Sequence, residues 1–145
     1  MAVTVKEITL WRREIDNRPG TLAQTLGPLA KGAVDVEVVM AYRFPGDESR
    51  GAVELFPISG KKAVAAAQAA GLTPAADIPA VLVTGANRVG IGYETTLAIA
   101  EAGINLAFVV AQVIGSRFSA VYGFDSEGDR RRAVALLKKT TGRRR

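Results

Sequence analysis

The stretch Asn17-Arg18-Pro19-Gly20 returns 70 residues later as Asn87-Arg88-Val89-Gly90, and this repetition decides how the whole chain is interpreted. The same offset aligns Ala63-Val64-Ala65 with Ala133-Val134-Ala135 much further along the chain. Only the segment between the second and third expected strands needs a gap. A register that is held in separate segments at one offset indicates two copies of one small module.

Within each copy, the spacing of apolar residues predicts the order strand, helix, strand, strand, helix. Leu22, Leu26 and Leu29 fall at helical spacing, so we expect them to form one apolar face. Pro28 is expected to kink or shorten that helix because it removes a backbone hydrogen bond. The expected elements are 8–11, 22–29, 36–42, 52–58 and 61–70 in the first copy, and 81–84, 91–102, 105–114, 118–124 and 130–139 in the second.

The fourth strand of each module is expected to be exchanged. Residues 72–78 follow the first copy directly and have the composition of a strand, whereas no such segment follows the second copy. Residues 2–6 extend the first strand backwards, and the 70-residue offset places them opposite residues 72–76. We therefore expect an α+β fold with domains at 1–78 and 79–145, in which residues 72–78 complete the first sheet and residues 2–6 the second.

The composition limits the chemistry that is available to this chain. Its 145 residues include no cysteine and no histidine. A disulfide scaffold, a thiolate zinc site, a cysteine nucleophile and any Ser–His arrangement are therefore excluded. We expect no enzyme, no catalytic residue, no metal and no cofactor.

The glycine-rich stretch 83–92 suggests two nucleotide-binding loops, and both fail on spacing. The loop of short-chain dehydrogenases has a spacer that is one residue shorter, and no tyrosine here is followed four residues later by lysine. A phosphate-binding P-loop requires Lys-Ser/Thr where this chain has Ile91-Gly92.

The net charge of +5 arises entirely in the second half of the chain, and most of it clusters at 130–132, 138–139 and 143–145. Such a cluster suits either a solvated terminus or contact with nucleic acid. There is no helix-turn-helix pattern and only 6% of residues are aromatic, which disfavours nucleic acid as a partner. The longest apolar stretch, 102–115, is too short to span a bilayer, and the chain does not start as a signal peptide does. We expect a cytoplasmic protein without membrane contact.

The loop Asp16–Leu22, which follows a strand and opens a helix in a duplicated pattern, resembles the first loop of ACT domains. These domains are ferredoxin-like βαββαβ modules, with antiparallel sheets and helices on one face, that commonly sense amino acids. The resemblance covers residues 7–139 as two tandem domains. It implies a stand-alone regulatory protein that binds an amino acid, or a similar small zwitterion, at the junction between ACT domains.

The resemblance also implies which residues bind the ligand. In serine-sensing ACT domains, contacts come from the loop asparagine of one domain and from a residue at the start of the second strand of its neighbour. By this likeness Asn17 pairs with Asn105, and Asn87 pairs with Asp35. A histidine two residues before the loop asparagine is absent here, which puts serine specificity in doubt. The implied ligand-binding residues are Asn17, Arg18, Pro19, Gly20, Asp35, Asn87, Arg88, Val89, Gly90 and Asn105.

Simpler roles for the same residues stay open at this point. Asn17 and Asn87 suit turn stabilisation, and Asp35 and Asn105 suit the polar start of a strand. The open sheet edges predict a homodimer, and the expected partner is a regulated enzyme or a transcription regulator. The alternatives in function are a ligand-free dimerisation or protein-interaction module and a nucleic-acid-associated regulator that uses the basic C-terminus.

Overall fold

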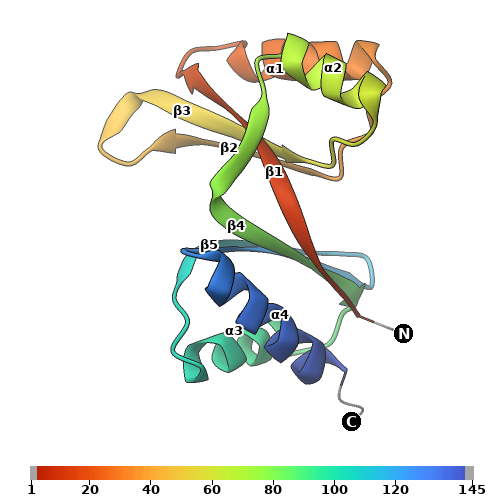
Figure 1. The fold of residues 1–145 in the computed structure, drawn as a ribbon, viewed down its shortest axis with the longest axis vertical. Helices are drawn as coiled ribbons and strands as arrows, with labels where there is room; N and C mark the ends of the chain where they lie inside the picture. Colours follow the sequence, from red (N-terminus) through yellow and green to blue (C-terminus); the bar gives the residue numbers. More distant parts are fainter. Residues whose placement is uncertain (1–2, 143–145) are drawn as a thin grey trace. The chain divides into compact units, whose positions relative to one another are not determined.

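The computed structural model describes residues 3–142, which form four helices and six strands (Figure 1). In hydrogen-bonded order the strands run β2-β3-β1-β4-β6-β5. The expected α+β class is confirmed. The elements are β1 (Thr4–Asp16), α1 (Thr21–Lys31), β2 (Val38–Phe44), β3 (Asp47–Phe56), α2 (Lys61–Ala69), β4 (Thr73–Ala86), α3 (Ile91–Glu101), β5 (Leu106–Ile114), β6 (Arg117–Phe124) and α4 (Glu127–Thr141).

The chain divides into two compact units, and each unit takes strand segments from distant parts of the sequence. Thr9–Ala76 form the N-terminal unit, whereas residues 3–8 and 77–142 together form the C-terminal unit. The division therefore follows Ala76 and not residue 78, and residues 3–8 do not group with the first copy. β1 and β4 are hydrogen-bonded neighbours and each contributes to both units.

The expected strand exchange is thus confirmed for the residues that the structure describes; Ala2 lies outside them. The first part of β1 serves the C-terminal unit, where Val5 is buried in one core cluster with Val81 and Val83. The first part of β4 serves the N-terminal unit. Arg130 in α4 links the two exchanged strands within the C-terminal unit. Its Nη1 donates to the carbonyl oxygens of Ile8 on β1 (3.2 Å) and Ala80 on β4 (3.3 Å).

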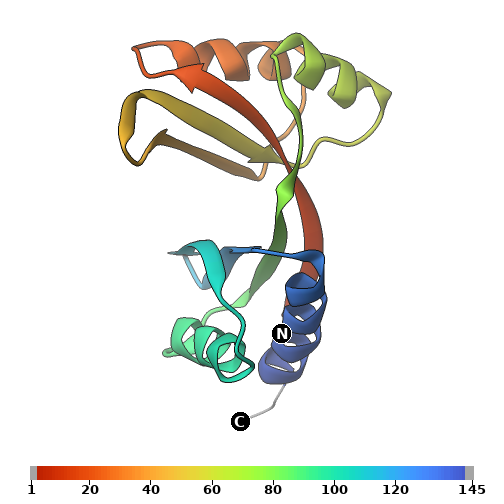
Figure 2. The ribbon, with the colours of Figure 1, turned by 60° about the vertical axis from the view of Figure 1, so that its left-hand side comes forward.

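In each unit both helices lie on one face of the strands (Figures 1 and 2). In the N-terminal unit, β3 pairs antiparallel with β1 and with β2. In the C-terminal unit, β6 pairs antiparallel with β4 and with β5. The N-terminal core is built from Leu29, Val53, Leu55, Ala67, Ala70 and Leu72, and the C-terminal core includes Ile91, Ile99, Ile104, Phe118, Phe124 and Leu137.

The buried face of α1 differs from the expected leucine face. Thr21, Thr25 and Leu29 are buried, whereas Leu22 is exposed. The Thr25 hydroxyl can be buried because it donates to the carbonyl of Thr21 (2.9 Å) and accepts a hydrogen bond from Arg13 (3.1 Å). A hydrogen-bonded threonine satisfies its polar atom locally and presents a methyl group to the sheet.

The second copy repeats this arrangement with a different partner. Thr95 in α3 has no exposed surface, and its hydroxyl lies 2.7 Å from the Tyr122 hydroxyl on β6. Burial raises the pKa of the Tyr122 phenol above its ordinary value, and the hydrogen bond with Thr95 offsets part of that rise. A buried threonine therefore joins the first helix of each copy to its sheet.

The expectation that Pro28 shortens its helix is wrong. α1 contains 11 residues, as α3 does, although Pro28 lies inside it. Pro28 stands in the last turns of α1, and its carbonyl still accepts from the Gly32 N–H at 3.0 Å. Burial of Thr25 and Leu29 on either side of it retains the helical path.

The strand exchange predicts a contrast between two neighbouring residues of β1. Val5→Asp places a carboxylate in the C-terminal core and forfeits the burial of a valine, which costs at least about 2 kcal/mol. Thr4→Asp changes an exposed side chain and should stay within about 0.5 kcal/mol of the parent. Thermal and urea unfolding measure both variants. Equal midpoints for the two variants would contradict the exchange.

The buried hydroxyl pair predicts a non-additive mutant cycle. Thr95→Val removes the partner of the Tyr122 hydroxyl and should cost about 1–3 kcal/mol. Adding Tyr122→Phe removes the stranded hydroxyl, so the double variant should be more stable than the sum of the two single losses predicts. Urea unfolding of the four proteins measures the coupling, and purely additive losses would show that the pair contributes nothing.

Candidate functional site

The loop between β1 and α1 leaves the first turn of α1 open towards solvent. Gly20, the residue before the helix, has a φ of 92°, and no side chain caps the helix. The first turn also holds no acidic residue. The amide groups at the start of a helix, together with its dipole, present partial positive charge that suits a carboxylate.

Asn17 connects this loop by hydrogen bonds to the hairpin between β2 and β3. Its side-chain Nδ2 donates to the carbonyl of Glu48 (2.7 Å), and its backbone N–H donates to the carbonyl of Ser49 (2.9 Å). This is the turn-stabilising role that the sequence left open. The Nδ2 group makes the bond to Glu48, so the side-chain Oδ1 of Asn17 takes no part in it. Asn17 is an exposed residue.

A hollow of about 300 Å³ lies beside the loop. It brings together the loop residues and the end of β2, where Arg43 adds a second guanidinium to that of Arg18. Gly51 lets β2 approach, since a Cβ there would collide with the Tyr42 carbonyl oxygen. The lining residues are Ile15, Asn17, Arg18, Gly20, Thr21, Leu22, Ala41, Tyr42, Arg43 and Gly51.

Arg43 is the charged side chain of this hollow that the sequence analysis did not single out. Arg43 lies about 25 positions after the loop, and it reaches the hollow only because β2 pairs with β3, and β3 with β1. The expected strand 36–42 ends one residue before Arg43, and the register of β2 turns the Tyr42 side chain to the opposite face of the sheet from Arg43. Pro19 is exposed and does not line the hollow.

The loop of the second copy has the same backbone and a different charge arrangement. Gly90 has a φ of 85°, and the Asn87 N–H donates to the carbonyl of Ser116 at 2.8 Å, as the first loop contacts its own hairpin. Arg88 forms an ion pair with Glu94 at 2.5 Å, and Glu94 stands in the first turn of α3. Val89 is fully exposed. The positive end of α3 thus already faces a carboxylate of its own chain.

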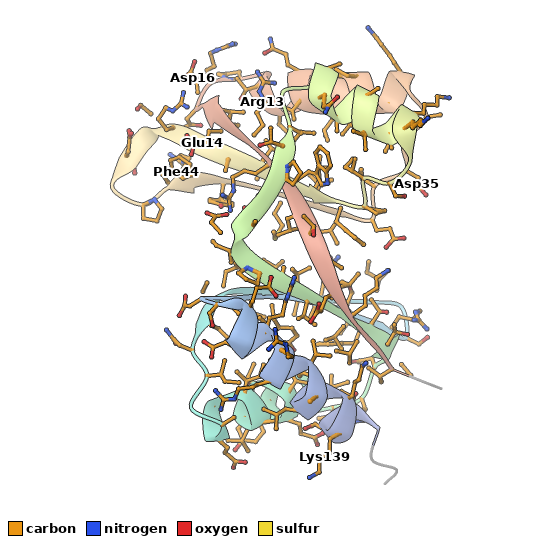
Figure 3. The ribbon with its side chains drawn as sticks, in the orientation of Figure 1. Arg13, Glu14, Asp16, Asp35, Phe44 and Lys139 are labelled. Carbon is orange, nitrogen blue, oxygen red and sulfur yellow. The ribbon has the colours of Figure 1, made fainter. Side chains whose placement is uncertain are left out.

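Each unit separates its loop from the start of its second strand. In the N-terminal unit Asn17 contacts Ser49 at one end of β3, whereas the Glu37 N–H donates to Phe56 at the other end. Seven residues of extended chain span roughly 23 Å. Figure 3 shows Asp16, next to Asn17, and Asp35 at opposite ends of this unit.

The C-terminal unit has the same separation between Asn87 and Asn105. Asn87 contacts Ser116 at the start of β6, and Leu106, which follows Asn105, pairs with Phe124 at its end. No unit can therefore join its own loop asparagine to its own strand-start residue. Asp35 instead lines a separate hollow of about 280 Å³ with Ser59 and Lys62.

Residues 3–142 contain neither a metal-binding cluster nor a membrane-spanning helix. No group of three or more histidine, cysteine, aspartate or glutamate side chains in this range is placed to hold a metal ion. None of the helices in the same range is long and apolar enough to cross a membrane.

Solved structures with a similar backbone show which fold this chain has. The chain is similar to the ligand-free regulatory subunit of aspartate kinase from Thermus thermophilus, with 16% identity, a TM-score of 0.62 and 95% of each chain covered. It is similar to a protein from Bacteroides thetaiotaomicron, with 14% identity, a TM-score of 0.73, and 93% and 89% of the two chains covered. The chain has the fold of aspartate kinase regulatory subunits.

Further structures of aspartokinase agree with this assignment of the fold. The alpha and beta subunits of one such enzyme match with 16% identity and a TM-score of 0.60, and 99% of each chain is covered. No protein-family model matches the sequence, and no curated protein matches it significantly. The likeness therefore lies in the backbone, at sequence identities that show the fold alone.

The loop backbone predicts opposite effects for two glycines of the same copy. Gly20→Ala forces a side chain into the left-handed region and should cost about 1–2 kcal/mol. Gly27→Ala lies inside α1, where a Cβ meets no atom within 4 Å, and should stabilise by about 0.5–1 kcal/mol. Chemical unfolding measures both. Destabilisation by Gly27→Ala, or none by Gly20→Ala, would contradict the loop geometry.

Proposed function

We propose that the chain is a tandem ACT-domain regulatory protein that binds an amino acid, with the carboxylate of the ligand at the open first turn of α1. The observation that carries this proposal is the hollow beside Gly20, where an uncapped helix start meets Arg18 and Arg43. The fold supports it, because the similar structures include the regulatory subunit of aspartate kinase and the alpha and beta subunits of aspartokinase.

The chemistry of the hollow favours a small acid with hydrogen-bonding groups. The first-turn amides donate to one carboxylate, and a guanidinium binds carboxylates through paired charge-assisted hydrogen bonds. Two guanidinium groups at one hollow favour a ligand with more than one carboxylate. The Asn17 amide supplies polar atoms that select the orientation of the ligand.

The two loops are proposed to differ in affinity. At α3, a ligand carboxylate competes with Glu94, which is already paired with Arg88. At α1, no acidic residue stands in the first turn. We therefore assign the tighter site to Asn17, Arg18 and Gly20 and the weaker one to the loop of Asn87 and Gly90.

A neighbouring domain is proposed to complete each site. Because each unit keeps its loop and its strand start apart, Asp35 and Asn105 reach a loop only from another unit or another copy. The pairing of Asn17 with Asn105 and of Asn87 with Asp35 remains the prediction from the sequence. A ligand held between two domains shifts the chain towards the arrangement that binds it best, and a partner enzyme or transcription regulator would respond to that shift.

A thermal-shift screen with each of the twenty amino acids tests the proposal. A ligand present at about 100 times its dissociation constant adds roughly 2.7 kcal/mol of stability, which is readily seen. Arg18→Gln and Arg43→Gln each remove a charged hydrogen bond and should weaken binding roughly 10- to 100-fold.

Lys31→Gln is the matched control, since it removes one positive charge from the far end of α1 and should leave the affinity unchanged. Asn87→Ala should have less effect on the tighter site than Asn17→Ala. No hit among twenty amino acids, or a hit that both arginine variants leave unchanged, would overturn the proposal and favour a ligand-free interaction module.

A further inference from the structure

The two helices of the C-terminal unit leave a hollow of about 420 Å³ between them. Arg132, near the start of α4, donates from its Nη2 to the carbonyl of Ala102 (2.7 Å), the residue that directly follows α3. The start of α4 therefore lies beside the end of α3. From there the hollow follows α3 back to Glu94 and α4 on to Thr140, so the two helices run antiparallel along it. We call this hollow the α3–α4 groove.

The groove has apolar walls, and an exposed apolar stripe continues from it along α3. Ala98 and Leu136 line the groove together with Leu97, which is 38% exposed. Tyr93, four residues earlier on the same face of α3, is 69% exposed. Exposed apolar side chains at helical spacing beside a groove suit the apolar face of another helix.

The first copy has small residues at the positions that build this stripe and groove. At the 70-residue offset, the residues in place of Tyr93, Leu97 and Leu136 are Ala23, Gly27 and Ala66. α1 and α2 also approach closely, since a Cβ on Gly32 would lie 3.1 Å from the Cβ of Ala66. The large apolar side chains of the second copy are therefore not a requirement of the fold, and their exposure needs another reason.

The two walls of the groove carry opposite charges. Glu101 on the α3 wall and Lys139 on the α4 wall form no ion pair with any residue in the range 3–142. Lys139 projects from the last turns of α4 (Figure 3). The exposed Arg131 and Lys138 extend the positive charge of α4, whereas Glu94, on the α3 wall, is already in the ion pair described above. The complementary occupant has carboxylates over α4 and a cation over Glu101.

We propose that the α3–α4 groove binds an amphipathic helix of a partner protein, with an apolar face over Leu97 and Leu136, an acidic flank towards α4 and a basic flank towards Glu101. A helix fits because the side chains of neighbouring helices form grooves that accept the ridges of another helix. Opposite charges on the two walls also fix its direction, since turning the helix end for end exchanges its flanks. The hollow beside Gly20 takes no part, so this inference stands whether or not an amino acid binds there.

A synthetic peptide is the probe for the groove. It has about 18 residues and forms an amphipathic helix with a leucine face, a glutamate flank and a lysine flank. Fluorescence anisotropy of the labelled peptide should show saturable binding to the full chain. Leu97→Ser removes apolar contact area and should weaken binding roughly 10-fold. Tyr93→Ser should also weaken binding, and because Tyr93 is largely exposed it should leave the melting temperature unchanged.

Val39→Ser is the matched control for Leu97→Ser. Val39 is 42% exposed, close to the exposure of Leu97, but it lies on β2 in the other unit. This substitution should leave the affinity for the peptide unchanged.

Reversal of the wall charges tests the proposed direction. Glu101→Lys and Lys139→Glu should each weaken binding about two- to fivefold. The double variant should restore the affinity and turn the peptide end for end. A spin label at the N-terminus of the peptide should therefore broaden amide signals near one end of α3 in the parent protein and near the other end in the double variant.

The same measurements can overturn the proposal. No saturable binding, equal losses with Leu97→Ser and Val39→Ser, or one peptide direction in both the parent and the double variant would each contradict it. A parent protein that self-associates in sedimentation and becomes monomeric with Leu97→Ser would assign the groove to a second copy of the chain. Tighter peptide binding after removal of residues 143–145 would assign the groove to that segment.

Discussion

The structure of this protein depends on two strands, β1 and β4, each of which is long enough to belong to both units. The sequence of each copy supplies three strands and two helices, and its sheet lacks a fourth strand. β1 and β4, of 13 and 14 residues, each continue beyond one unit into the other, and they remain hydrogen-bonded neighbours. Val5 is buried in the C-terminal core, whereas Trp11 and Ile15 pack against the N-terminal core. A one-residue slip of β1 would turn all three to the wrong face, so burial in two cores fixes one register.

The duplicated loops have diverged in charge while keeping one backbone. Gly20 and Gly90 have almost the same φ, and both loops contact the hairpin of their own unit. The first helix start faces Arg18 and Arg43, and the second faces the Arg88–Glu94 pair. Two loops with the same backbone and different charges are expected to bind one ligand with different affinities. This charge difference is the physical basis for assigning the tighter site to the first loop.

The parts that were predictable from sequence are those that repeat or alternate. The 70-residue offset gave the element order, and the backward extension of the first strand indicated the exchange before any contact was known. Thr25 and Thr95 were not predicted as core residues, because periodicity counts threonine as polar and does not detect a hydroxyl that bonds within its own helix. Arg43 joined the loop through two strand pairings, a relation between distant segments that periodicity does not contain. The start of α4 was expected at residue 130. It begins at Glu127 because the Ser126 hydroxyl accepts from the Asp129 N–H at 3.1 Å.

The central claim, that the open start of α1 holds the carboxylate of an amino acid, is tested most directly by amide chemical shifts. A ¹⁵N-labelled sample titrated with each of the twenty amino acids reports on every backbone N–H separately. The account predicts saturable shifts that are largest at Thr21, Leu22 and Ala23 for at least one amino acid, with smaller changes at the α3 start. Saturable shifts confined to other segments, or no saturable shift with any amino acid, would contradict it.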